Sequence, residues 1–294
     1  MTEAFQERKS KEGRNTNYNH PNPLLLKFVS AGLRGAEWFS QGLALRWASR
    51  LLHTAHRRKP NHREKELFKK GTPFWVPYNE NKIFVMSWGS GPAVLLVHGW
   101  NGNVTQLSPF IEPLLEQGYR VVALDGPAHG QSSGKRTDIV HFAAAVFAVA
   151  KTIGSVQSAI GYSLGGSATV LASQNGLVVE RLALISTPIC MKDIIERFSA
   201  SLKLSRQLSS DLVQLTERKL GQSLSSVSVS TIAPNLKIPT LIVHDREDVV
   251  VPYEDGEILA NLLPDAQLVS TTGLGHRHIL YDRQVIQEVI AFIA

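Results

Sequence analysis

The sequence predicts an α/β domain built on a mostly parallel, doubly wound sheet, preceded by a helical extension. Short, wholly apolar runs recur between residues 93 and 271, and such runs are typical of strands buried on both faces. Segments of helical length alternate with these runs, which predicts helices on both faces of a parallel sheet. A Gly-x-Ser-x-Gly motif lies at one strand-to-helix junction, where it indicates a tight turn with the serine at its tip.

Charge divides the chain of 294 residues, of which 43% are hydrophobic, enough for a sizeable core. Residues 1–70 hold 15 Lys and Arg against 6 Asp and Glu, whereas the remainder holds 16 against 19. The basic character therefore belongs to the extension, and the rest has the charge expected of an enzyme for small, uncharged molecules. The single cysteine, Cys190, excludes an internal disulfide; it lacks the turn motif of a nucleophile.

We expect a basic amphipathic helical extension over residues 1–70 and an α/β domain over 71–294, with a helical cap insertion at 189–238. Residues 1–23 are charged and Asn-rich, and we expect them to be disordered. Residues 24–56 predict one long helix or two shorter ones, because their apolar residues follow helical spacing: Leu25, Val29, Gly32, Ala36, Phe39, Leu43, Trp47 and Leu51.

This apolar stripe has two interpretations. In the first it packs on the body of the protein, and the basic run at 56–63 is a solvated linker. In the second it lies in a membrane interface, with Lys and Arg near anionic head groups, so that residues 24–59 make a peripheral contact. We favour the first, because most amphipathic stripes face a core.

Location and metal binding are constrained by what the sequence lacks. We see no secretory signal and no apolar run long enough for a transmembrane helix, so we expect a cytoplasmic protein. His53, His56 and His62 are not accompanied by Cys, Asp or Glu at ligand spacing, and we expect no metal there.

The alternation of elements is regular except at one interruption, Pro188–Pro239. We read this Ser- and Leu-rich stretch as a helical lid at the strand ends, where open α/β sheets place their ligands. The expected strands are 82–88, 93–97, 120–125, 156–162, 181–186, 240–244 and 266–271, and the expected helices are 105–116, 137–152, 166–174, 254–263 and 282–293.

The stretch Gly161-Tyr162-Ser163-Leu164-Gly165 joins an apolar strand to a small-residue helix. A serine at the tip of such a strained turn needs neighbours without Cβ atoms so that its hydroxyl stands clear. The first free N–H groups of the helix then point at the reacting centre. The alternative is an ordinary Gly/Ser turn.

A serine hydroxyl needs a base, and the base needs an acid that fixes its tautomer. Asp248, in the loop after strand 240–244, is our acid, with Asp245 and Glu247 as rivals; all three could instead cap the helix near Glu254. His276, after strand 266–271, is our base.

His278 and His129 are the alternative bases, and either His276 or His278 could instead be a surface imidazole. For the developing oxyanion we expect two backbone donors, the N–H of Leu164 and the N–H of Trp100, which follows Gly99 in the loop after strand 93–97. The ring of Trp100 would then line the pocket. Asp125 could serve as a structural hydrogen-bond acceptor in its turn.

These motifs together resemble the α/β-hydrolase superfamily over about residues 80–294. The resemblance is carried by His98-Gly99-Trp100, by residues 125–132, by the serine turn, by Asp248 through Pro252 and by Gly275-His276. It implies a Ser163–Asp248–His276 triad with the Trp100 and Leu164 amides as oxyanion hole. One departure is Asp245, where relatives usually carry glycine.

The expected function is that of a serine hydrolase that cleaves a carboxylic ester or thioester of a largely apolar small molecule through an acyl-serine. The alternative from another class is a catalytically weak ligand receptor or interaction protein on the same scaffold. We expect no cofactor, no metal and no nucleic-acid partner, and the sequence assigns no oligomeric state, acyl chain length or substrate. Amidase, C–C hydrolase and cofactor-free peroxidase chemistry remain open.

Overall fold

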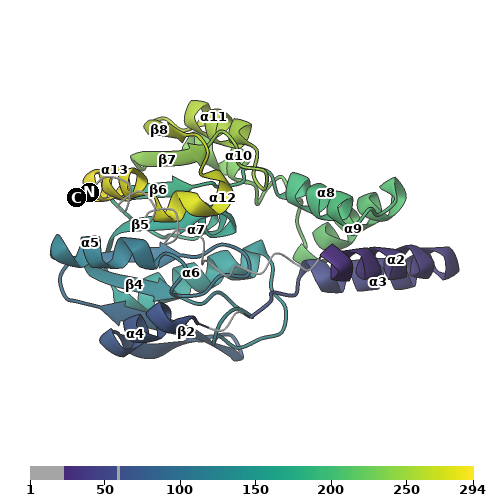
Figure 1. The fold of residues 1–294 in the computed structure, drawn as a ribbon, viewed down its shortest axis with the longest axis horizontal. Helices are drawn as coiled ribbons and strands as arrows, with labels where there is room; N and C mark the ends of the chain where they lie inside the picture. Colours follow the sequence, from purple (N-terminus) through teal and green to yellow (C-terminus); the bar gives the residue numbers. More distant parts are fainter. Residues whose placement is uncertain (1–22, 58–59) are drawn as a thin grey trace, which may run out of the picture.

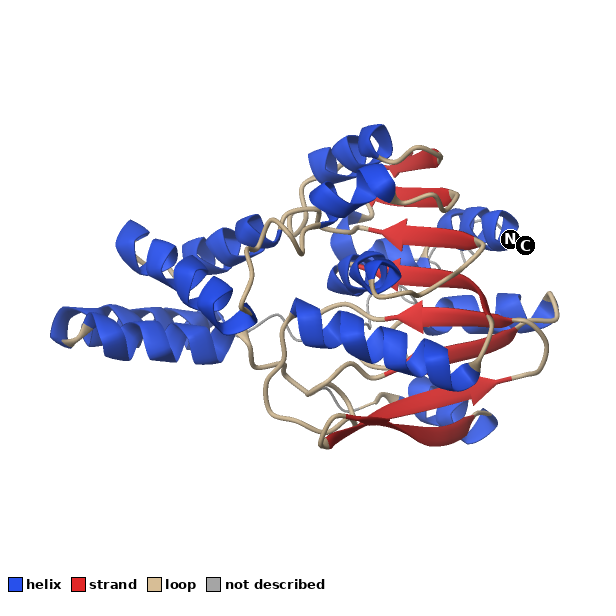
Figure 2. Ribbon diagram, turned by 180° about the vertical axis from the view of Figure 1, so that it is seen from behind, coloured by secondary structure: helices blue, strands red, loops and turns tan. Residues whose placement is uncertain are grey.

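A computed structural model describes residues 23–57 and 60–294 and contains an eight-stranded sheet (Figures 1 and 2). The expected disorder of residues 1–23 concerns a stretch that, apart from Pro23, lies outside the described residues. Strand order is β1-β2-β4-β3-β5-β6-β7-β8; β2 is antiparallel to both of its neighbours, β1 and β4, and all other neighbouring strands are parallel. The strands are β1 (Thr72–Tyr78), β2 (Asn81–Trp88), β3 (Ala93–Val97), β4 (Arg120–Leu124), β5 (Val156–Tyr162), β6 (Arg181–Ile185), β7 (Thr240–Asp245) and β8 (Ala266–Thr271).

Helices cover both faces of the sheet, and the alternation of side chains along each strand explains why. In β3, Leu95 and Val97 join the core under α6 (Ile139–Ile153), α7 (Leu164–Gln174) and α11 (Tyr253–Leu262). Val94 and Leu96 join the core on the opposite face, under α5 (Ile111–Glu116) and α13 (Arg283–Ile293). A strand buried on both sides therefore reads as a continuous apolar run, and the predicted α/β fold class is confirmed.

Strand β1 was not expected from the sequence. Its residues, T-P-F-W-V-P-Y, contain Pro73 and Pro77, which cannot donate to a neighbouring strand. The strand lies at the edge of the sheet and pairs with β2 alone, so one side of its backbone needs no partner strand. The edge position makes the two prolines tolerable.

Four helices from distant parts of the chain form an arm that projects from the sheet (Figures 1 and 2). The arm consists of α2 (Pro23–Phe39) and α3 (Gln41–Leu52) from the extension, and α8 (Met191–Ser201) and α9 (Arg206–Leu220) from the insertion. The short α10 (Val229–Ile232) then returns the chain to α7 and the sheet. Residues 24–56 thus contain two helices rather than one, and these pack on the insertion.

The contacts within the arm show that α3 and α9 run parallel in fixed register. Gln41 Nε2 donates to Asp211 Oδ2 at 2.5 Å, and Lys219 Nζ donates to Ser49 Oγ at 2.6 Å, and both pairs are 170 residues apart. On α2, the buried Ser30 hydroxyl donates to the carbonyl of Leu202 at 2.6 Å. These bonds tie the extension to the turn and the second helix of the insertion.

The face that the arm buries differs from the stripe expected from the sequence. The buried residues of α2 and α3 are Ser30, Leu33, Ala44, Ala48 and Ser49, most of them small. Four members of the expected stripe are exposed instead: Leu25, Phe39, Leu43 and Trp47. Small side chains allow the helices to approach closely, and they leave the large apolar residues on the outside.

The expected linker between arm and domain is largely structured. Arg57 donates to the carbonyl of Ser132 at 2.7 Å and to that of Gly134 at 2.9 Å, and the His56 amide donates to Asn101 Oδ1 at 2.7 Å. The helix α4 (His62–Lys70) follows, and it begins with a capping box between Asn61 and Glu64. Of the basic run, Arg58 and Lys59 lie outside the described residues.

Candidate active site

The predicted site residues meet at the carboxyl ends of the strands, where the strand order reverses. Strand β3 lies between β4 and β5, so the loops that follow β3 and β5 leave in different directions, and open α/β sheets place their ligands at such points. The loop after β3 carries Gly99 and Trp100, and β5 ends at Tyr162, directly before Ser163. A Cβ added at Gly99 would lie 3.0 Å from Ser163 Cβ, so the two loops are in direct contact.

Ser163 occupies the strained turn that the motif predicts. Its backbone lies at φ 51° and ψ −129°, which a residue with a side chain rarely adopts. The flanking glycines are required because the backbone comes close to other atoms there. A Cβ added at Gly161 would lie 2.5 Å from Gly166 Cα, and one added at Gly165 would lie 2.2 Å from the His98 carbonyl oxygen. The turn therefore holds the serine between β5 and the start of α7.

Three side chains from separate loops form a continuous hydrogen-bonded chain. His276 Nε2 lies 3.1 Å from Ser163 Oγ, and His276 Nδ1 lies 2.7 Å from Asp248 Oδ2. A carboxylate accepts only, so Nδ1 carries the proton and donates to Asp248, and Nε2 is left to accept from the serine hydroxyl. The structure thus brings together Ser163, Asp248 and His276, which the sequence selected as nucleophile, acid and base.

Asp248 is held as a carboxylate by its surroundings. Its Oδ1 accepts from the amides of Val250 and Val251 at 2.8 and 2.9 Å. Burial by itself raises the pKa of Asp248, but the hydrogen bond and charge of His276 and the two amides outweigh it and lower the pKa. The group is therefore ionised at neutral pH, as an acid that orients a histidine must be.

The rival acid Asp245 has another task. Its Oδ2 accepts from the Thr271 hydroxyl at 2.7 Å and from the Leu274 amide at 3.1 Å, and its Oδ1 accepts from the Glu247 amide at 2.9 Å. These bonds tie the loop after β7 to the loop after β8. Neither Asp245 nor Asp248 caps α11, whose N-cap position is Pro252 with no side-chain bond.

Two residues that the sequence analysis did not select lie beside the hydrogen-bonded Ser163–His276–Asp248 chain. The Tyr162 hydroxyl donates to the backbone carbonyl of His276 at 2.7 Å. His244 is fully buried in β7, with Nε2 at 3.1 Å from the Val251 carbonyl and 3.6 Å from Asp248 Oδ2. Tyr162 could have been noticed as the residue before the serine, and His244 as a polar side chain at the end of an apolar run.

The predicted oxyanion donors lie at the same edge. Leu164 is the first residue of α7, so its N–H has no partner within the helix. Trp100 follows Gly99 in the loop that touches Ser163, and its half-buried ring packs edge-on against His129 at 5.0 Å. The Gly99 amide itself is taken, because it donates to Gln106 Oε1 at 2.9 Å.

Two buried histidines support the loop of Trp100 and stay neutral. His98 Nδ1 donates to the Gly99 carbonyl at 2.7 Å, and its Nε2 accepts from the Gly126 amide at 2.8 Å. Burial and the neighbouring His129 hold the pKa of His98 well below its usual value. Burial also lowers the pKa of His129 to about 4. Their roles are therefore structural, and His129 is not the base that contacts Ser163.

Asp125, expected to be a structural acceptor, does accept backbone bonds. Its Oδ1 accepts from the Val104 amide at 2.7 Å and its Oδ2 from the Gln131 amide at 2.6 Å. Burial raises the pKa of Asp125 to about 6, despite these bonds and the charge of Arg57. The residue joins the loop after β3 to the loop after β4.

The remaining candidates are not part of this constellation. His278 is exposed, and burial raises the pKa of the Cys190 thiol, which disfavours a reactive thiolate. Within residues 23–57 and 60–294, no group of three or more His, Cys, Asp and Glu side chains is placed to hold a metal ion. No helix in the same ranges is long and apolar enough to cross a bilayer.

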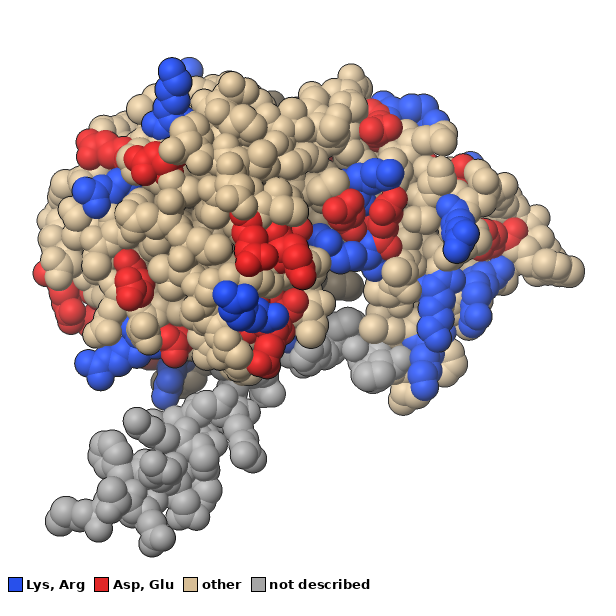
Figure 3. All heavy atoms as spheres, turned by 90° about the horizontal axis from the view of Figure 1, so that it is seen from above, with Lys and Arg blue, Asp and Glu red and all other residues tan. Residues whose placement is uncertain are grey.

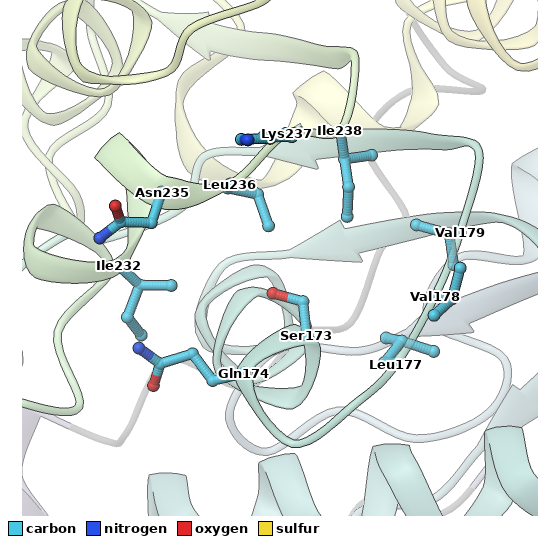
Figure 4. Close-up of a pocket in the computed structure, with 10 residues that line it drawn as sticks. All are labelled: Ser173, Gln174, Leu177, Val178, Val179, Ile232, Asn235, Leu236, Lys237 and Ile238. Carbon is cyan, nitrogen blue, oxygen red and sulfur yellow. The ribbon is translucent and has the colours of Figure 1, made fainter.

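Two cavities in the described part of the chain lie away from Ser163. One of about 350 Å³ is at the amino ends of β6 and β7, where Leu177, Val179, Ile232 and Ile238 line it (Figure 4). Another of about 300 Å³ lies between Arg57, Phe68 and Asp125. Neither includes a residue of the Ser163–His276–Asp248 chain, so the chemistry of the edge, and not cavity size, identifies the site.

Comparison with known families agrees with the fold. Residues 92–218 match the family model described as alpha/beta hydrolase fold, and residues 217–294 match the model of TAP-like protein. The chain belongs to the α/β-hydrolase superfamily.

Individual relatives are distant. The chain is 26% identical to the AB hydrolase superfamily protein YisY of Bacillus subtilis, covering 71% of this chain and 94% of that protein. It is 25% identical to a bifunctional esterase/perhydrolase of Acinetobacter calcoaceticus, covering 72% and 95%. An esterase structure from Pyrococcus furiosus superposes with a TM-score of 0.63 at 22% identity, covering 82% of this chain and 96% of that chain. This last similarity concerns the fold.

Proposed function

We propose that the protein is a serine hydrolase that cleaves a carboxylic ester or thioester of a largely apolar small molecule. The observation that carries the proposal is the hydrogen-bonded chain from Ser163 Oγ through His276 to Asp248, at 3.1 and 2.7 Å. The chain joins the three groups that acyl transfer needs in the required order: a hydroxyl, an imidazole and a carboxylate.

The reaction proceeds in two halves. Ser163 Oγ attacks the carbonyl carbon while His276 Nε2 takes the hydroxyl proton, and Asp248 stabilises the imidazolium that forms. His276 then returns this proton to the leaving alcohol or thiol, which leaves an acyl-serine. A water molecule gives a proton to His276 Nε2 and attacks the acyl carbon, and Ser163 leaves with that proton.

Negative charge develops on the carbonyl oxygen in both halves. The Leu164 N–H at the start of α7 is one donor for this oxygen, and the Trp100 N–H is the second in our proposal. The positive end of α7 adds to this stabilisation because the helix begins at the residue after the nucleophile.

The insertion supports an apolar substrate. Leu164, partly exposed beside the nucleophile, packs against the same large apolar core as the partly exposed Ile194 and Phe198 of α8. An acyl chain that meets such side chains gains free energy by leaving water. The relative from Acinetobacter calcoaceticus, named an esterase/perhydrolase, is compatible with this class of substrate.

The test combines a fluorophosphonate probe with a series of nitrophenyl esters of increasing acyl length. We expect the wild-type protein to be labelled and Ser163→Ala to be unlabelled, with hydrolysis lowered on the order of 10³-fold or more. Cys190→Ala is the matched control and should keep both labelling and rate. A wild-type protein that resists the probe but changes its melting temperature with apolar ligands would contradict the proposal and favour a receptor.

A further inference from the structure

The outer face of the α2–α3 hairpin is apolar and lies on the surface. Phe28, Trp38 and Phe39 are 75, 82 and 81% exposed, and Leu25 and Leu43 are more than half exposed. Along α2 these residues follow helical spacing, with Gly32 and Gly35 between them, so one side of the helix forms a continuous uncharged strip. Monomeric soluble proteins rarely leave such strips in water without a use.

The strip ends at the tip of the arm. Trp38 and Phe39 stack edge to face at 4.8 Å just before the turn at Ser40. The other end of α3 is fixed to the domain, since the His53 carbonyl accepts from the Thr137 amide at 2.9 Å. The aromatic pair therefore stands at the far end of a projecting hairpin, as Figure 2 shows for the turn between α2 and α3. Aromatic side chains on a projecting tip can enter a bilayer interface without hindrance from the domain.

Charge identifies the kind of surface that the hairpin fits. Residues 23–52 contain four basic side chains, Lys27, Arg34, Arg46 and Arg50, all exposed, and one acidic side chain, Glu37. Glu37 is engaged by the Ser205 hydroxyl on the inner side of the arm. Figure 3 shows blue side chains, with red ones among them, on the lobe that the four helices of the arm form. Two copies of this face would bring like charges together, whereas an anionic membrane would attract them.

We propose that the α2–α3 hairpin is an interfacial anchor that binds anionic membranes. Phe28, Trp38 and Phe39 enter the boundary between head groups and acyl chains, and the Lys and Arg side chains at the edges of the strip pair with lipid phosphates. The inner side of the hairpin stays bound to α9, so docking needs no rearrangement of the arm. The proposal is independent of the chemistry at Ser163.

The experiment is co-sedimentation of the full chain with vesicles of phosphatidylcholine alone or with about one third phosphatidylglycerol. We expect binding to the anionic vesicles that weakens as salt is raised. Trp38→Ser with Phe39→Ser should lower the partition coefficient at least about tenfold, because two aromatic side chains no longer leave water. Arg34→Glu should lower it about fivefold or more on anionic vesicles.

Val178→Ser is the matched control, because Val178 is another highly exposed apolar residue and lies in the segment before β6. It should bind as the wild type does. Phe28→Ser repeats the test away from the ring pair, and unchanged melting temperatures show that all variants are folded. Equal vesicle binding by the wild type and the Trp38/Phe39 variant would overturn the proposal. A second result would also overturn it: the wild type binds neither kind of vesicle and forms a dimer in solution, and the Trp38/Phe39 variant is a monomer.

Discussion

The Tyr162 hydroxyl donates a 2.7 Å hydrogen bond to the backbone carbonyl of His276, and the two rings lie 5.1 Å apart. The residue before the nucleophile thus holds the loop that carries the base. Distance between Ser163 and His276 is set by this bond as well as by the side chains themselves.

Tyr162→Phe removes this bond and keeps the ring. We expect kcat for ester hydrolysis to fall about 10- to 100-fold with little change in KM, because His276 is less well placed for proton transfer. Tyr119→Phe is the control, since its hydroxyl bonds the Ile293 carbonyl at the far side of the domain. An equal loss in both variants would show that the effect is general destabilisation rather than positioning.

Substitutions of Asp248 and Asp245 should have different effects, the first on the catalytic rate and the second on stability. Asp248→Asn leaves the fold intact but removes the carboxylate that orients His276, and we expect kcat to fall on the order of 10³- to 10⁴-fold. Asp245→Asn replaces one of the two acceptor oxygens by an NH2 group, so the bonds to one side of the carboxylate are lost, and we expect mainly a lower free energy of unfolding, by about 1–3 kcal/mol. Steady-state rates together with denaturant unfolding distinguish the two. Comparable rate losses in both variants would contradict the assignment of Asp248 as the acid.

Backbone strain at Ser163 predicts a difference between two inactive variants. Ser163→Gly should be more stable than Ser163→Ala by about 1 kcal/mol, because glycine adopts φ 51° and ψ −129° without steric cost. Both variants lack the hydroxyl, so they differ in the backbone preference of residue 163 and not in the loss of the nucleophile. Urea unfolding measures it, and equal midpoints would mean that the turn stores little strain.

His129 predicts a pH dependence of stability. Its pKa is about 4 in the folded protein against 6.5 for an unperturbed histidine, so the unfolded chain binds the proton first as pH falls. This contribution to stability is present above pH 6.5 and is lost progressively toward pH 4. His129→Phe cannot be protonated there.

Between pH 6.5 and 4.5 the wild type should therefore lose about 2–3 kcal/mol more stability than His129→Phe. The lost hydrogen bond from Nδ1 to the Pro127 carbonyl shifts the variant equally at both pH values. Urea unfolding at the two pH values measures the difference. Parallel pH profiles would show that His129 is protonated inside the fold.

The meeting of Ser163, Asp248 and His276 could be predicted because each follows a strand, and a parallel sheet brings the carboxyl ends of its strands to one edge. Position in the sheet does not choose between Asp248 and Asp245 as the acid, because both lie at the carboxyl end of the same strand. Asp245 is the last residue of β7, and its side chain turns toward Thr271 on β8. Three residues later Asp248 faces His276. Such differences arise from loop geometry, which hydrophobic pattern does not encode.

The extension shows a different limit. Helical spacing predicted which residues of α2 share a face, but it could not say which face another helix covers. Ser30 and Ala44 are buried because small residues let helices approach, whereas Phe39 and Leu43 remain outside. Strand β1 shows the same limit, since tolerance of Pro73 depends on an edge position that is a property of the whole sheet.

The parallel pairing of α3 with α9 has a consequence for how the protein is made. Gln41 meets Asp211, and Ser49 meets Lys219, across 170 residues of chain. During synthesis the hairpin therefore leaves the ribosome well before its partner exists, and its inner side waits uncovered until most of the sheet has been translated. Contacts of such long sequence separation slow folding, so the arm should be among the last parts of the molecule to assemble.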